Sequence, residues 1–84
     1  MREKGIVMDL KQILTDIARA IVDNPDAVNV DETVDGDKVE LVLTVDEGDT
    51  GMVIGRHGRI AKAIRQVMKA AANTCNKHVT VEIK

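Results

Sequence analysis

The sequence contains no phenylalanine, tyrosine, tryptophan or serine, and it has one proline and one cysteine. Without Phe, Tyr or Trp, the aromatic stacking of nucleobases that RRM domains and many OB folds use is unavailable. Without serine it has no serine nucleophile, and it shows no Walker loop, dinucleotide fingerprint or nucleophile elbow. The single cysteine, Cys75, excludes an internal disulfide, so we expect a reducing, cytoplasmic location. These absences argue against an enzyme.

Long apolar runs and metal-ligand patterns are absent as well. No apolar segment approaches the roughly 20 residues of a membrane-spanning helix, and no signal-peptide pattern opens the chain. His78 lies far from His57 in the sequence and has no ligand partner at metal spacing. The acids at 35–37 and 46–49 lack the ordered ligand positions of a calcium loop, so they are interpreted as turns and caps. We therefore expect no metal, no cofactor and no membrane insertion.

Charge is divided unevenly along the 84 residues, a length that fits one domain. Residues 1–50 contain five Lys or Arg and thirteen Asp or Glu, whereas residues 51–84 contain seven Lys or Arg and one acid, Glu82. The net charge of −2 therefore combines a balance of −8 with one of +6. This asymmetry is typical of a polyanion-binding half, although charge alone fits a solvated basic surface equally well.

Apolar periodicity predicts a helix followed by a hairpin. The helix begins after Asp9, which can cap its N-terminus while Met8 and Ile13 form a hydrophobic staple, and it ends near Asp23. Two strands of alternating apolar residues follow, joined by a turn at Asp35-Gly36-Asp37. The alternating residues are Val28, Val30, Val39, Leu41, Leu43 and Val45.

The C-terminal half predicts a short helical turn, a long helix and a last strand. The turn spans Thr50–Ile54, the long helix runs from about Arg59 to Asn73, and the strand covers 78–83. The apolar face of the long helix is predicted to contain Ile60, Ala61, Ile64, Met68, Ala71 and Cys75, with Val67 beside it. A three-stranded sheet with helices packed on one face buries these stripes in one core. We therefore expect a mixed α/β domain of the α+β kind over residues 9–84, preceded by an N-terminal extension over residues 1–8.

The segment Gly55-Arg56-His57-Gly58 is the most informative motif. Its glycines allow a sharp turn and a close approach of phosphates to the peptide groups. The helix that follows offers unpaired N–H groups and the positive end of its dipole. Arg56 and His57 place charge at the loop tip, basic residues of the helix extend it, and aliphatic neighbours form a floor for bases. The predicted contacts are Val53, Ile54, Gly55, Arg56, His57, Gly58, Arg59, Ile60 and Lys62.

This segment resembles the KH family. Gly55-Arg56-His57-Gly58 matches the GXXG loop, and the apolar residues around it match the flanking pattern, whereas isolated glycines would only punctuate a helix–turn–helix. The order helix, strand, strand, helix, helix, strand is that of type II KH domains. The chain resembles most the KhpA family of small stand-alone bacterial KH proteins, over roughly residues 9–84. Met52 departs from the pattern, because the family often has a lysine or arginine there.

The resemblance implies a protein without enzymatic activity that clamps about four nucleotides of single-stranded RNA. It also implies a homodimer or a complex with a larger KH protein of the KhpB (Jag) type. Roles in post-transcriptional regulation, RNA chaperoning, cell division and cell shape follow from the same resemblance. The alternative is a protein-interaction module that dimerises and binds RNA only weakly or incidentally. Arg65 and Lys69 are interpreted as solvated or partner-facing rather than as RNA contacts.

Overall fold

The computed structural model describes residues 9–84, so the predicted extension over residues 1–8, including the staple expected of Met8, lies outside the described residues. The elements in chain order are α1 (Leu10–Ile21), β1 (Asn29–Asp35), β2 (Lys38–Thr44), α2 (Thr50–Ile54), α3 (Arg59–Thr74) and β3 (His78–Ile83). Single 3₁₀ turns at Pro25–Ala27, Glu47–Asp49 and Arg56–Gly58 connect them. The predicted order of helices and strands is confirmed.

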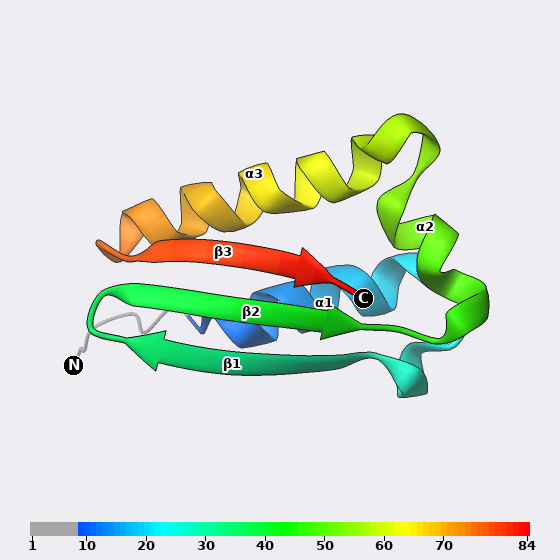
Figure 1. The fold of residues 1–84 in the computed structure, drawn as a ribbon, viewed down its shortest axis with the longest axis horizontal. Coiled ribbons are helices and arrows are strands. Elements are labelled where there is room, and N and C mark those ends of the chain that lie inside the picture. Colours follow the sequence, from blue (N-terminus) through cyan, green and yellow to red (C-terminus); the bar gives the residue numbers. More distant parts are fainter. Residues whose placement is uncertain (1–8) are drawn as a thin grey trace.

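The three strands form one sheet in the order β1-β2-β3, with β2 in the centre (Figure 1). β1 and β2 are antiparallel and are joined by a two-residue turn, since Asp35 pairs with Lys38. β3 runs parallel to β2, with Val79 opposite Val39 and Val81 opposite Leu41. The parallel pairing requires the chain to cross over between β2 and β3, and α2 and α3 make that crossover.

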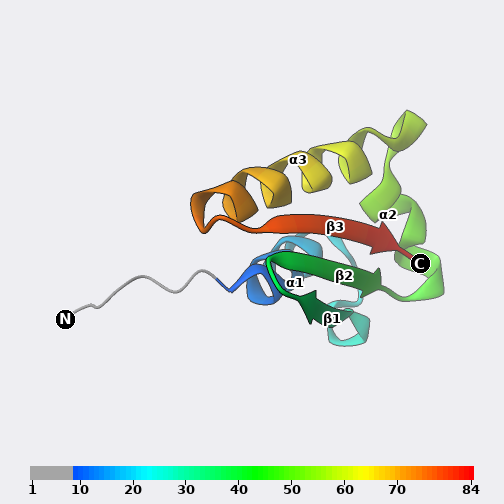
Figure 2. The same ribbon diagram turned by 60° about the vertical axis from the view of Figure 1, so that its left-hand side comes forward.

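The core lies between the sheet and the two longer helices. α1 and α3 contact each other, and each contacts the sheet (Figure 2). In β2 the side chains alternate between buried and exposed or half-buried, which confirms that the helices cover one face of the sheet. α1 begins as predicted, because the Asp9 carboxylate accepts a hydrogen bond from the backbone N–H of Gln12 at 3.2 Å. The fully buried side chains of the core are Leu14, Ala18, Leu41, Leu43, Val53 and Met68.

The buried face of α3 differs in part from the prediction. Ile60, which the sequence assigns both to the apolar face of the helix and to the floor for bases, is 37% exposed, and Val67, expected beside that face, is 51% exposed. The helix buries the series Ala61, Ile64, Met68 and Ala72 instead. Residues 60 and 67 belong to a neighbouring row, which the 3.6-residue period turns away from the sheet. An apolar row on α3 therefore remains at the surface.

The acids before α2 also differ from the expectation that all of them form turns and caps. Asp46 accepts from the backbone N–H of Gly48 at 3.0 Å, as a turn residue does. Asp49 is only 2% exposed and makes no side-chain bond to the N-terminus of α2. Its Oδ2 atom accepts from the backbone N–H of Asn24 at 2.9 Å and from the Asn24 side-chain amide at 3.1 Å. Asp49 therefore fastens the segment after α1 to the beginning of α2.

Candidate nucleic-acid interface

The loop at 55–58 joins α2 to α3 through a backbone conformation that depends on its glycines. Three of its four residues have positive φ: 76° at Gly55, 57° at His57 and 72° at Gly58. The N–H of Gly55 donates to the carbonyl of Gly51 at 2.8 Å, which ends α2, and the N–H of Gly58 donates to the carbonyl of Gly55 at 3.2 Å, which closes the loop. A Cβ atom on Gly55 would lie 2.6 Å from Cγ1 of Ile60. The loop therefore packs tightly against the first turn of α3.

The tip of the loop is formed by Arg56 and His57, whose side chains are both exposed. His57 adopts the left-handed conformation, which costs a residue with a Cβ atom about 1–2 kcal/mol. Such strain is characteristic of functional segments that the surrounding structure holds in place. Here Gly55 and Gly58 allow the chain to turn, while the side chains of Arg56 and His57 are exposed to solvent.

The N-terminus of α3 opens directly from this loop. Gly58 occupies the capping position and has no side chain to accept from the first helical N–H groups, and the first turn contains no acid. The N–H of Arg59 donates to the carbonyl of Arg56, whereas the next N–H groups have no partner within the helix, and the helix dipole places partial positive charge on them. An anion is therefore favoured at this position, and Arg59 and Lys62 are exposed beside it.

The predicted contact residues come together at the α2–loop–α3 corner, but they differ in exposure. The side chain of Val53 is fully buried, so it supports the loop from the core and presents no surface. Ile54 and Ile60 are each 37% exposed and provide apolar area next to the loop. The four basic-capable side chains are exposed. The corner thus combines open backbone N–H groups, positive charge and aliphatic surface.

Comparison with known proteins assigns this architecture to a family. The KhpA/KhpB KH-domain model matches residues 11–83. The chain belongs to the KhpA/KhpB KH-domain family. It is 53% identical over 74 residues to the RNA-binding protein KhpA of Clostridium acetobutylicum, covering 88% of this chain and 99% of that protein. It is 40% identical over 74 residues to the RNA-binding protein KhpA of Bacillus subtilis, covering 88% of this chain and 91% of that one.

Solved structures share the fold at low sequence identity. The crystal structure of Era in complex with MgGDPNP and nucleotides 1506–1542 of 16S ribosomal RNA matches 98% of this chain with a TM-score of 0.57 and 18% identity. Aquifex aeolicus Era bound to GDP and AlF4⁻ matches 99% of it with a TM-score of 0.55 and 16% identity. The chain spans 35% of the length of each Era chain. These similarities show that this chain shares its fold with about a third of each Era chain.

The basic residues of this KH domain continue from the loop along α3. Lys62, Arg65 and Lys69 are three and four positions apart, which places them on one side of the helix. Arg65 is directed at the sheet, because its Nε atom donates to the carbonyl of Val81 in β3 at 3.3 Å. The sequence could not predict this contact, because Arg65 and Val81 belong to different elements and only the fold brings α3 and β3 together.

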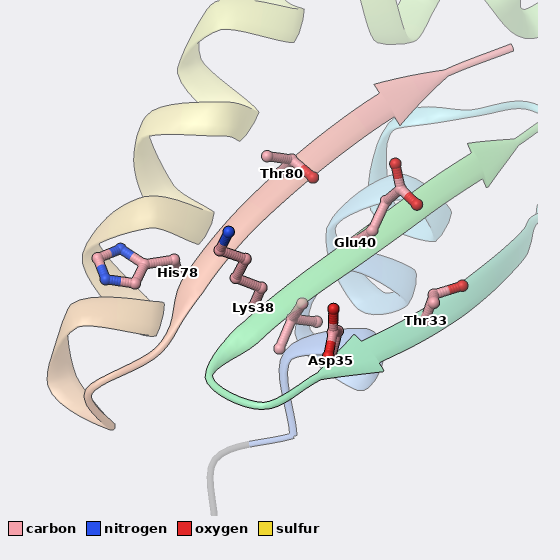
Figure 3. Close-up of a pocket in the computed structure, with 7 residues that line it drawn as sticks. Thr33, Asp35, Lys38, Glu40, His78 and Thr80 are labelled. Atoms are coloured by element: carbon pink, nitrogen blue, oxygen red, sulfur yellow. The ribbon is translucent and has the colours of Figure 1, made fainter.

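A second surface feature lies on the face of the sheet that the helices leave open. A depression of about 510 Å³ near the β1–β2 turn is lined by Thr33, Asp35, Lys38, Val39, Glu40, His78 and Thr80 (Figure 3). It mixes both signs of charge, and His78 lies 3.9 Å from the Asp37 carboxylate at its rim. It lies at the opposite end of the sheet from the α2–α3 corner (Figure 1). A polyanion would find no concentration of positive charge there.

The described part of the chain holds neither a metal-binding cluster nor a membrane-spanning helix. Residues 9–84 hold no group of three or more His, Cys, Asp or Glu side chains that could bind a metal ion. In the same range, no helix has the length and apolar character needed to cross a membrane. The α2–α3 corner therefore remains the candidate site.

Proposed function

We propose that this KH domain binds single-stranded RNA, with phosphates at the loop 55–58 and bases over the aliphatic side chains beside it. The observation that carries the proposal is the uncapped N-terminus of α3, which opens onto a glycine-flanked tip containing Arg56 and His57. Its relatives in Clostridium acetobutylicum and Bacillus subtilis bear the name RNA-binding protein KhpA, which supports the same function. The protein acts as a binding module and not as an enzyme.

The surface suits a single strand better than a duplex. KH domains clamp four nucleotides through their GXXG loop, and recognition of single strands uses bases that are splayed out of the stack. Ile54 and Ile60 offer apolar area to such bases, whereas the chain contains no Phe, Tyr or Trp ring for stacking. One domain with so few contacts is expected to bind weakly. Its affinity should fall with salt at a slope of about −2 to −3, since each of three or four phosphates neutralised contributes roughly −0.7.

The test replaces the loop tip while keeping both glycines. In the double variant Arg56→Asp and His57→Asp two carboxylates face the phosphates, so most RNA affinity should be lost. The fold should persist, because exposed substitutions change stability by less than roughly 0.5 kcal/mol and aspartate tolerates the left-handed conformation at position 57. Fluorescence anisotropy with an unstructured RNA oligomer measures the affinity, and circular dichroism melting measures the stability.

A matched control changes one permanently charged basic residue and one histidine elsewhere. Lys38→Asp combined with His78→Asp alters the charge by the same amount on the open face of the sheet, where both side chains are exposed. This control should retain nearly all the affinity of the wild type. A folded loop variant with unchanged affinity would show that the loop is only structural. Equal affinity for a hairpin stem and an unstructured oligomer would contradict the preference for single strands.

Self-association is a second candidate function, favoured by the exposed apolar row on α3. Ile60 and Val67 are two turns apart on the same side of the helix, with Ala63 and Ala70 exposed along the same row. We propose that this row packs against a second copy of the chain or against a larger KH protein of the KhpB type. Such pairing would join two RNA-binding loops in one particle. A role in post-transcriptional regulation or RNA chaperoning fits both functions. Cys75 is a free thiol, which is consistent with the proposed reducing, cytoplasmic location.

A further inference from the structure

The outer edge of β3 presents backbone groups that the sheet does not use. β3 is an edge strand, and its pairing with β2 uses alternate residues: the N–H of His78 donates to the carbonyl of Asp37 at 2.8 Å, and the N–H of Lys84 donates to that of Leu43 at 2.9 Å. Because successive peptide groups of a strand point to opposite sides, the N–H and C=O groups of Val79, Val81 and Ile83 point away from β2. They form a row of donors and acceptors along the strand.

Arg65 bridges this edge to α3. Its Nε atom donates to the carbonyl of Val81 at 3.3 Å, and the side chain remains exposed. A guanidinium carries five N–H donors in a rigid planar fork and accepts nothing. With Nε engaged at the strand, the two terminal amino groups remain for another partner. The contact to Val81 limits how the plane of the fork can rotate, so these donors are oriented before any ligand arrives.

Arg65 lies within the reach of an RNA strand held at the loop. Arg65 follows Gly58 by seven positions, or about 10 Å along the axis of α3. Four clamped nucleotides contain three steps, each at least as long as the roughly 3.4 Å rise of a stacked strand, so the clamped segment spans at least about 10 Å. Lys62 and Lys69 flank Arg65 on the same side of the helix and continue the positive charge in this direction. A base of the clamped segment can therefore reach the guanidinium.

We propose that Arg65, anchored through Nε to the carbonyl of Val81, reads one RNA base and selects a base with two adjacent hydrogen-bond acceptors. The proposal rests on the proposed RNA-binding function and deepens it. Guanine offers O6 and N7, the pair that arginine contacts most often, and cytosine offers N3 and O2 on its Watson–Crick edge. On the corresponding edges of adenine and uracil an N–H donor stands beside each acceptor, so no two acceptors are adjacent. Single strands expose both edges, so either guanine or cytosine fits the fork.

The chemistry assigns different roles to Arg65 and to the neighbouring lysines. A lysine ammonium is a compact point charge that cannot form the two parallel bonds of a guanidinium, so it attracts phosphate without distinguishing bases. Lys69 is one turn further along α3 and is exposed. It supplies general affinity, while Arg65 supplies the base preference. Under this proposal Arg65 belongs to the RNA surface, whereas the sequence alone predicts a solvated or partner-facing side chain.

The experiment measures base preference at a single position. Seven-nucleotide oligouridine and three versions with one central guanosine, cytidine or adenosine are titrated against the full chain by fluorescence anisotropy. The wild type should bind the guanosine or the cytidine oligomer at least about fivefold more tightly than the uridine and adenosine oligomers. Arg65→Lys keeps the charge and should reduce this ratio to less than about twofold. Lys69→Gln should weaken all four oligomers by the same factor and leave the ratio unchanged.

The outcomes separate the proposal from the function on which it rests. A preference that is lost in Arg65→Lys and kept in Lys69→Gln supports base reading by Arg65, and the preferred oligomer identifies the base. Binding that depends on Arg56 and His57 but shows no base preference overturns the role of Arg65 alone, as does a preference that survives in Arg65→Lys. If the wild type binds none of the four oligomers, both the proposed function and the role of Arg65 are wrong. Circular dichroism melting confirms that each variant is folded.

Discussion

Gly55 combines a backbone conformation that L residues rarely adopt with a neighbour that leaves no room for a side chain. Its φ of 76° and ψ of 173° fall in a region occupied almost only by glycine, and a Cβ atom would lie 2.6 Å from Ile60 Cγ1. We expect Gly55→Ala to lower the free energy of unfolding by about 1–3 kcal/mol. For a domain of this size, each kcal/mol corresponds to a fall of roughly 4–8 °C in the melting temperature. Thermal or urea denaturation measures the loss.

Two other glycines serve as controls for Gly55. Gly58 has a φ of 72° but open space around its Cα, so Gly58→Ala should cost only the left-handed conformation, about 1–2 kcal/mol. Gly51 lies within α2 with space for a Cβ atom, and Gly51→Ala should stabilise the protein by roughly 0.5–1 kcal/mol. Equal effects of alanine at positions 55 and 51 would show that the loop conformation does not require glycine.

The junction between α1 and α2 depends on one buried carboxylate. Asp49 accepts two hydrogen bonds from Asn24, which lies 25 positions earlier in the chain. Asp49→Ala leaves the partly buried N–H of Asn24 without its acceptor, so we expect a loss of about 1–3 kcal/mol of stability. Combining it with Asn24→Ala in a double-mutant cycle should give a coupling energy of roughly 0.5–3 kcal/mol. Urea denaturation of the four proteins measures this energy.

Asp46→Ala is the matched control for this junction. Asp46 lies three residues earlier, is exposed and bonds only within its own turn, to the N–H of Gly48. Asp46→Ala should lower the free energy of unfolding by less than Asp49→Ala does, and its coupling energy with Asn24→Ala should be near zero. A coupling energy near zero for Asp49 and Asn24 would mean that the two residues do not hold the helices together.

The assembly of whole molecules should depend on the apolar row of α3. Val67 is 51% exposed, and a glutamate there would place a charge in the centre of the proposed contact. We expect Val67→Glu to shift the protein toward the monomer while leaving its melting temperature, taken at a concentration where the wild type is monomeric, almost unchanged. Sedimentation over a range of protein concentrations measures the association.

The control for Val67 is Gln66→Glu, which adds the same charge at an exposed position one residue earlier and about 100° around the helix. It should associate like the wild type. A wild type that stays monomeric at every accessible concentration would remove self-association, but not pairing with a larger KH protein. If Val67→Glu binds RNA as the wild type does, the part of the apolar row around Val67 is not needed for RNA binding, and only Ile60 is shared by the two surfaces.

Local chemistry made the order of elements predictable. The cap at Asp9, the hairpin turn at Asp35-Gly36-Asp37 and the alternation in the strands each depend on residues a few positions apart. The same holds for the loop 55–58, where two glycines and two basic-capable residues stand together in the sequence and in space. Such features can be predicted without knowledge of the fold, because backbone geometry and side-chain periodicity are properties of short segments.

Tertiary packing decided the features that join distant segments. Asp49 meets Asn24 across 25 positions, and Arg65 meets Val81 across 16. The exposure of Ile60 also depends on packing, because periodicity marks an apolar row but does not show which row the sheet covers. The sequence by itself determined the elements, the basic half and the glycine loop. Only the fold determined which side of α3 is buried, which acid is internal and which arginine reaches the open edge of β3. These features depend on how the helices and strands pack against one another.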